Sequence, residues 1–111
     1  MRRVDLNSLN SEPLSHDTSS SKQVFIRNGT IPHLTQLAQV HIPPGTRLTP
    51  HAHSDMHEIF IVISGQGRLH CEGATHNISP GTCIQIAPSE VHAFENHGDG
   101  ELVLVYFGVE E

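Results

Sequence analysis

Three histidines and a glutamate close together in the chain could bind a metal ion. They lie in the stretch from Gly45 to Gly65, GTRLTPHAHSDMHEIFIVISG, within eight residues of one another: His51, His53, His57 and Glu58. Imidazole and carboxylate groups offer lone pairs at neutral pH, and together they suit a divalent transition metal. Metal binding is therefore the first hypothesis, and the spacing of these residues and the strands around them test it.

The spacing of these residues carries more information than their number. In a chain with ten histidines, a pair such as His51 and His53 is expected about once by chance. Requiring Glu58 and the two flanking glycines as well lowers the chance expectation to under roughly one in a thousand. Alternate residues of a strand share a face, so the pair can approach one ion, and Glu58 can return to it from the next strand. The same alternation favours a surface or supporting role for His57 over ligation.

Short apolar and β-branched runs, separated by turn residues, predict an all-β domain. Many short strands between Gly and Pro turns are typical of a sandwich or barrel, and no window shows a helical apolar period. We expect extended segments at Val24 to Arg27, Leu34 to Ile42, Arg47 to His53, Glu58 to Ile63, Gly67 to Cys71, Ala74 to Ile78, Thr82 to Ile86, His92 to Asn96 and Leu102 to Val109.

The run from Leu102 to Phe107 is apolar on both faces instead of alternating. A strand of this kind needs cover on both sides, from the core and from a neighbouring sheet or subunit. This pattern favours a homodimer.

A chain of 111 residues is long enough for one folded domain. Residues 1 to 22 are rich in Ser and Asn and have few large apolar side chains, so we expect a flexible N-terminal tail. The alternative is an arm that docks on a partner subunit. The barrel domain is then expected at residues 23 to 111.

Charge and composition exclude several partners. Six Lys and Arg against twelve Asp and Glu give a net charge of -6, which disfavours binding to a nucleic-acid backbone. No apolar run approaches the roughly 20 residues of a membrane span, and no apolar region follows Arg2 and Arg3, so we expect a cytoplasmic protein without membrane contact. Cys71 and Cys83 form no CxxC motif and are predicted to be buried free thiols.

A second stretch, from Gly81 to Asn96, extends the pattern and reads GTCIQIAPSEVHAFEN. The first stretch, read as G, five residues, HxH, four residues, E, six residues and G, resembles the first motif of the cupin superfamily. The second resembles the other cupin motif, with His92 at the expected distance from Gly81 and Asn96 four residues beyond. It departs at Ala87 and Ser89, where a proline and a glycine are usual; these positions shape the turn before His92.

The resemblance, to small single-domain cupins of the cupin 2 type, covers about residues 34 to 107. It implies an antiparallel jelly-roll β-barrel that holds one divalent transition metal ion. The matching positions imply four metal ligands and one supporting residue: His51, His53, Glu58 and His92, with Asn96 behind them. Such a ligand set leaves open positions on a six-coordinate ion. Residue types do not distinguish iron, manganese, nickel, zinc and cobalt.

Strand parity selects further residues around the ion. Phe60 and Phe94 each lie two positions beyond a candidate ligand, so both are expected inside the barrel, either as core or as pocket wall. Arg47 has the parity of the histidine pair. If the chain is extended through Pro50, Arg47 points inward and could bind a substrate carboxylate or phosphate. The alternative is an arginine that reaches solvent from a strand end.

The functional prediction is a metalloenzyme that acts on a small organic acid or related metabolite. Dioxygenation is favoured because open coordination positions could accept both substrate and dioxygen; a lyase or isomerase reaction is next. The catalytic residues stay unknown, since the facing of Gln36, Gln85 and His41 cannot be decided from the sequence. The alternative, from a different class, is a non-catalytic metal-dependent small-molecule binding or sensor protein.

Overall fold

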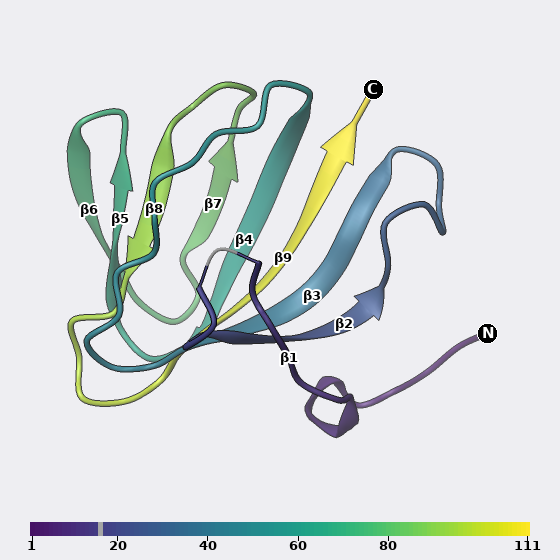
Figure 1. The fold of residues 1–111 in the computed structure, drawn as a ribbon, viewed down its shortest axis with the longest axis horizontal. Coiled ribbons are helices and arrows are strands. Elements are labelled where there is room, and N and C mark those ends of the chain that lie inside the picture. Colours follow the sequence, from purple (N-terminus) through teal and green to yellow (C-terminus); the bar gives the residue numbers. More distant parts are fainter. Residues whose placement is uncertain (16) are drawn as a thin grey trace.

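Two antiparallel sheets make up the fold (Figure 1). A computed structural model describes residues 1–15 and 17–111, and within them lie one short 3-10 helix and nine strands. The helix is η1 (Leu6–Ser8), and the strands are β1 (Glu12–Pro13), β2 (Ser21–Ile26), β3 (Leu34–Ile42), β4 (Met56–Ser64), β5 (Gly67–Cys71), β6 (Ala74–Ile78), β7 (Cys83–Ile86), β8 (His92–Glu95) and β9 (Leu102–Glu110). One sheet has the order β1-β2-β3-β9-β4-β7, and the other has the order β6-β5-β8.

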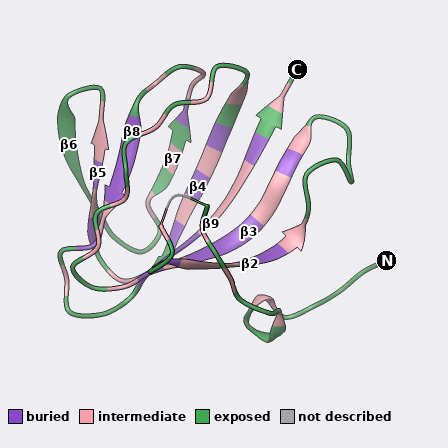
Figure 2. Ribbon diagram, in the orientation of Figure 1, coloured by how far each residue is buried: buried purple, intermediate pink, exposed green. Residues whose placement is uncertain are grey.

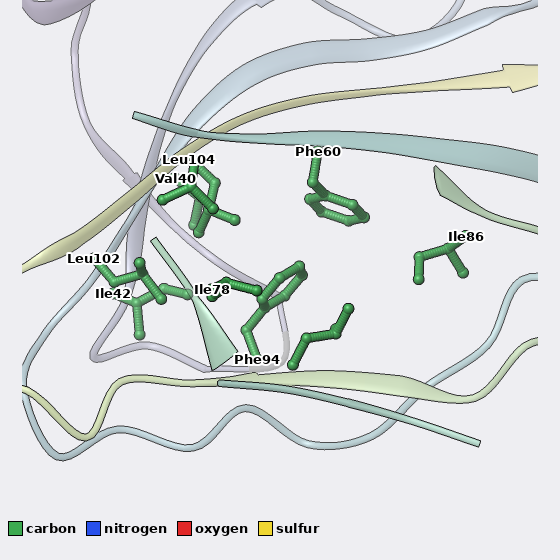
Figure 3. Packing of buried hydrophobic residues seen from close by; sticks show 10 residues of the cluster. Val40, Ile42, Phe60, Ile78, Ile86, Phe94, Leu102 and Leu104 are labelled. Atoms are coloured by element: carbon green, nitrogen blue, oxygen red, sulfur yellow. The ribbon is translucent and has the colours of Figure 1, made fainter. Parts of the chain in front are cut away.

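The core lies between the two sheets, where buried side chains of both meet (Figures 2 and 3). Strand alternation explains this: on β4, Glu58, Phe60 and Val62 are buried, and the residues between them are not. Phe60 from one sheet and Phe94 from the other point toward each other (Figure 3), with their ring centroids 4.8 Å apart. The predicted all-β antiparallel fold is confirmed, although the two sheets do not join edge to edge into a closed barrel.

Several predicted strands have the observed boundaries, namely β3, β5 and β6. The predicted strand from Arg47 to His53 is wrong as a regular strand. The segment touches β8 through two isolated bridges, Arg47 with Glu95 and His51 with His92. Pro50 lies between them and has no N–H to donate, which prevents a continuous ladder.

Several of the described residues among the first 22 pack on the domain in this structure. β1 pairs with β2, the side chain of Gln39 bonds to Asn7, and Leu14 packs against the core. The flexibility of this segment and the boundary at residue 23 stay predictions.

β9 lies in the middle of the larger sheet. The core covers its inner face, as its sequence predicts. Leu102 and Leu104 are fully buried in the core, and Val103 on the other face is 8% exposed, whereas Val109 is 42% exposed. A partner subunit over the outer face stays a prediction. No helix in the described part of the chain is long and apolar enough to cross a membrane.

Candidate metal centre

Three of the predicted ligands come together in space. Ligand atoms of His51, Glu58 and His92 all lie within 4.8 Å of one another. Glu58 comes from β4 and His92 from β8, so the two sheets each supply one residue. His51 comes from the irregular segment between β3 and β4. The group therefore sits at one end of the space between the sheets.

A backbone bridge holds the two histidines next to each other. The N–H of His51 donates to the carbonyl of His92, and the N–H of His92 donates back, both at 3.0 Å. Directly opposed residues of an antiparallel pair project their side chains to the same face. Their ring centroids are accordingly 4.6 Å apart.

The tautomers follow from the partners of the Nδ1 atoms. Nδ1 of His92 lies 3.0 Å from the carbonyl oxygen of Glu90, and Nδ1 of His51 lies 3.4 Å from that of Thr49. A carbonyl can only accept, so in a neutral ring Nδ1 carries the hydrogen and Nε2 keeps its lone pair. Such a lone pair is what a metal ion requires.

When the ring of His92 is neutral, Glu58 and His92 face each other with no donor between them. Glu58 Oε1 lies 3.2 Å from His92 Nε2, and both atoms are buried without a hydrogen-bond partner. A carboxylate oxygen and an unprotonated Nε2 both present lone pairs, so a proton or a cation is needed to make this contact favourable. These donors therefore fit a divalent transition metal ion.

The pKa values of the two imidazoles shift in opposite directions. Burial lowers the pKa of His51, and the nearby His92 lowers it further. Burial is also the largest single influence on His92 and acts downward. In the protonated ring, however, Nε2–H can donate to Glu58 and Nδ1–H to the carbonyl of Glu90, and the negative charges of both glutamates favour that form, so the pKa of His92 is raised. Glu58 thus attracts positive charge to this site.

His53 and His57 differ in their relation to the group. His53 Nε2 lies 3.6 Å from Glu58 Oε1, and its ring centroid is 5.0 Å from that of His51, so it borders the three grouped residues. His57 is exposed, as strand alternation predicts for the neighbour of a buried Glu58.

A cavity of about 480 Å³ opens from this group into the space between the sheets. Phe60 and Phe94 form part of its wall, and the Phe60 ring lies 6.1 Å from that of His92. The wall also includes polar residues that the sequence analysis did not single out as pocket residues: Lys22, Gln36 and Tyr106. Burial, with the charge of Glu58, raises the pKa of Tyr106 to about 12. The facing of Gln85 and His41 could not be predicted from the sequence. In the structure Gln85 is exposed, and His41 Nδ1 lies 2.7 Å from Glu101 Oε1.

The structure corrects the prediction for Arg47. This residue lines a second cavity of about 510 Å³, together with His70, on the face of the smaller sheet that points away from the core. Four steps along the chain separate Arg47 from His51, whereas their bridge partners Glu95 and His92 are three steps apart. The extra residue acts as a bulge and reverses the parity, so Arg47 faces away from the candidate metal centre.

Asn96 supports the loops and does not contact the candidate ligands. It is fully buried; its Nδ2 donates to the carbonyls of Ile42 and Gly100 at 2.8 Å, and its Oδ1 accepts from the N–H of Gly98 at 3.0 Å. These bonds join the end of β3 to the loop before β9.

Replacing Asn96 with alanine is expected to lower the free energy of unfolding by about 3 kcal/mol, because three hydrogen bonds of about 1 kcal/mol each are lost in a buried position. Urea unfolding measures the change. The control Asn77→Ala alters an exposed residue of β6 and should change the free energy by less than about 0.5 kcal/mol. An Asn96→Ala protein as stable as this control would contradict the assigned role.

The two cysteines are free, in agreement with the sequence, but the prediction that both are buried is wrong. Cys83 is exposed on the edge strand β7, and Cys71 is partly buried. Burial, followed by the charges of Glu90 and Glu72, raises the pKa of the Cys71 thiol.

Comparison with known proteins supports the fold and shows the family. The cupin domain family matches residues 38–108. An oxalate-binding protein of Thermotoga maritima is 31% identical over 65 residues, which make up 59% of this chain and 54% of that protein. The match therefore spans about half the length of the curated relative.

Solved structures resemble the whole chain. A predicted oxalate decarboxylase from Thermotoga maritima superposes with a TM-score of 0.92 at 20% identity, over 99% of this chain and 100% of the other. A cupin 2 conserved barrel domain protein from Salinispora arenicola gives 0.74 at 20% identity, over 99% and 87%. A polyketide cyclase from Streptomyces resistomycificus gives 0.85 at 22% identity, over 100% and 80%. At these identities the likeness shows the fold, and it confirms the predicted jelly-roll class.

Proposed function

The chain belongs to the cupin domain family, and from its site we propose that it is a metal-dependent protein that binds a small carboxylic acid at the ion. One observation carries the proposal: buried Glu58 Oε1 and His92 Nε2 lie 3.2 Å apart, and neither atom has a hydrogen-bond partner when the ring of His92 is neutral. We propose His51, His53, Glu58 and His92 as the metal ligands. His53 is included because its Nε2 lies 3.6 Å from the same Glu58 oxygen.

The curated relative supports the class of ligand. That protein is named for binding oxalate, and a similar solved structure is described as a predicted oxalate decarboxylase. An ion held by four protein ligands keeps open positions, and a carboxylate oxygen suits such a position. A bound divalent ion would polarise the carboxylate or carbonyl of the acid as a Lewis acid.

The reaction that follows binding is a separate proposal. Dioxygenation of the bound acid comes first because two open positions are available, with a lyase or isomerase reaction next. The non-catalytic alternative is favoured by the relative that is named only for binding. The cytoplasmic location and the homodimer also remain proposals.

Metal loading and ligand titration test the proposal together. Untagged protein supplemented with manganese, iron or zinc is expected to hold close to one ion per chain by elemental analysis. Calorimetric titration should then show oxalate binding to the loaded protein and none to the chelator-treated protein. Oxygen uptake with small acids separates oxygenation from simple binding. Absence of metal after supplementation, or equal oxalate binding with and without metal, would refute it.

A further inference from the structure

The cavity next to the candidate metal centre has a second polar group on its wall. Lys22 on β2, Gln36 on β3 and Tyr106 on β9 all line it. β3 and β9 separate β2 from β4, which carries Glu58. Through Val40 and Leu104, Lys22 is level with Val62 of β4, about 14 Å across the sheet at about 4.8 Å per strand, and Glu58 lies four residues from Val62 along that strand. The three residues form a cluster of their own, which we call the Lys22 cluster.

Hydrogen bonds give the Lys22 cluster a fixed direction. Lys22 Nζ donates to Gln36 Oε1 at 3.4 Å, and Gln36 Nε2 donates to the Tyr106 hydroxyl oxygen at 3.1 Å. An ammonium can only donate, so the amide must turn its oxygen toward Lys22 and its N–H groups toward Tyr106. The Tyr106 oxygen therefore accepts, and its own hydrogen is left to donate elsewhere. Lys22 likewise keeps two further N–H donors.

The charges around Lys22 leave its ammonium available. Glu12 on β1 is paired directly opposite Lys22, and its two carboxylate oxygens are bonded to Arg27, at 3.2 and 2.8 Å. No ion pair involves Lys22 in residues 1–15 and 17–111. A protonated phenol and an ammonium that both donate make a site for an oxyanion.

Apolar side chains lie between the Lys22 cluster and the candidate ligands, and Thr35, Asp55 and Glu110 also line the cavity. The Phe60 ring stacks on Tyr106 with centroids 5.5 Å apart and also approaches His92 at 6.1 Å. Val40, Ile42 and Phe94 line the same cavity. Its volume of about 480 Å³ is within the usual range for ligand pockets and far larger than oxalate can fill.

We infer that the Lys22 cluster binds the far end of the ligand, so that the preferred ligand is a dicarboxylic acid with an apolar spacer between its two carboxylates. One carboxylate meets the metal ion, the spacer lies against Phe60, and the other carboxylate accepts from Lys22 and Tyr106. The inference rests on the proposed function, because the first carboxylate needs the ion.

The test is a titration of manganese-loaded protein with oxalate, succinate and adipate. The wild type is expected to bind one of the longer acids more tightly than oxalate. Lys22→Met keeps the length of the side chain and removes its charge, so it should weaken that longer acid about tenfold or more and leave oxalate unchanged. Tyr106→Phe removes one hydroxyl, retains the stacking on Phe60 and should cause the same selective loss.

Arg68→Met is the matched control, because it removes the same charge from β5 on the face directed away from the core. It should leave every affinity unchanged. Equal weakening of oxalate and the longer acid by Lys22→Met, or no preference for a longer acid in the wild type, would overturn the inference while metal binding stands. A wild-type protein that takes up no manganese would refute the proposed function itself, and the inference with it.

Discussion

Replacing Glu58 with glutamine is expected to lower the affinity for a divalent transition metal by about 100-fold or more. The substitution keeps the shape of the side chain but removes the buried negative charge that faces His92 at 3.2 Å. Removing one member of a buried charged pair costs about 3 kcal/mol or more, which corresponds to about two orders of magnitude in affinity. Competition with a chromophoric chelator measures the dissociation constant for the variant and the wild type side by side.

The neighbouring His57 supplies the control, because it is exposed and points away from the site. His57→Ala should bind metal as tightly as the wild type. A second measurement is independent of metal: the carboxylate of Glu58 raises the pKa of His92, so Glu58→Gln should lower that pKa in the metal-free protein, as followed by NMR titration. Undiminished metal affinity in Glu58→Gln would remove Glu58 from the ligand set.

Local patterns in the sequence predict most of the strands. β3 and β5 are bounded by clear turn residues, and the structure has the predicted ends in both cases. Spacing alone predicts that His51 and Glu58 come together, but His51 is placed by an isolated bridge to His92 and not by the strand that the prediction assumes. His92 lies 34 residues beyond Glu58, and its place in the site was implied only by the resemblance to cupins.

The errors arise where a single residue changes the register. Strand parity counted through Pro50 predicts that Arg47 points inward, but the bulge between the bridges at Arg47 and His51 reverses the face. Gln36 is a comparable case, because it lies in a register shift between Leu34 and Leu37. Pro50 marks the first irregularity but does not show that it reverses the face of Arg47, and the second contains neither Gly nor Pro.

The rest of the cavity wall depends on pairing between distant segments. Lys22 enters the cavity because β2 pairs with β3, and Tyr106 does so because β9 lies between β3 and β4. The composition of residues 1 to 22 predicts a tail, yet Leu14 reaches the core once β1 pairs with β2. Lys22 lies two residues before Val24 and shares its face, but the strand predicted from Val24 begins too late to include it, since β2 begins at Ser21.

Replacing Gly65 with alanine is expected to destabilise the fold strongly, and more than the same replacement at Gly73. Gly65 has φ +84°, and a Cβ there would lie 2.3 Å from the carbonyl oxygen of Glu101 and 2.9 Å from Cα of Leu102. These are backbone atoms next to the fully buried Leu102, so they cannot turn aside as the end of a side chain would. The left-handed conformation costs about 1–2 kcal/mol, and the overlap adds about 1–3 kcal/mol.

Gly73 provides the matched comparison, since it has φ +80° and no atom within 4 Å of the position of a Cβ. Gly73→Ala is therefore destabilised only by the left-handed conformation, by about 1–2 kcal/mol. Both variants change the entropy of the unfolded chain equally, so this effect cancels in the comparison. Urea unfolding should place Gly65→Ala at least about 1 kcal/mol below Gly73→Ala, and failure of Gly65→Ala to fold would agree with this order. Equal stability of the two variants would contradict the close contact between Gly65 and the backbone at the start of β9.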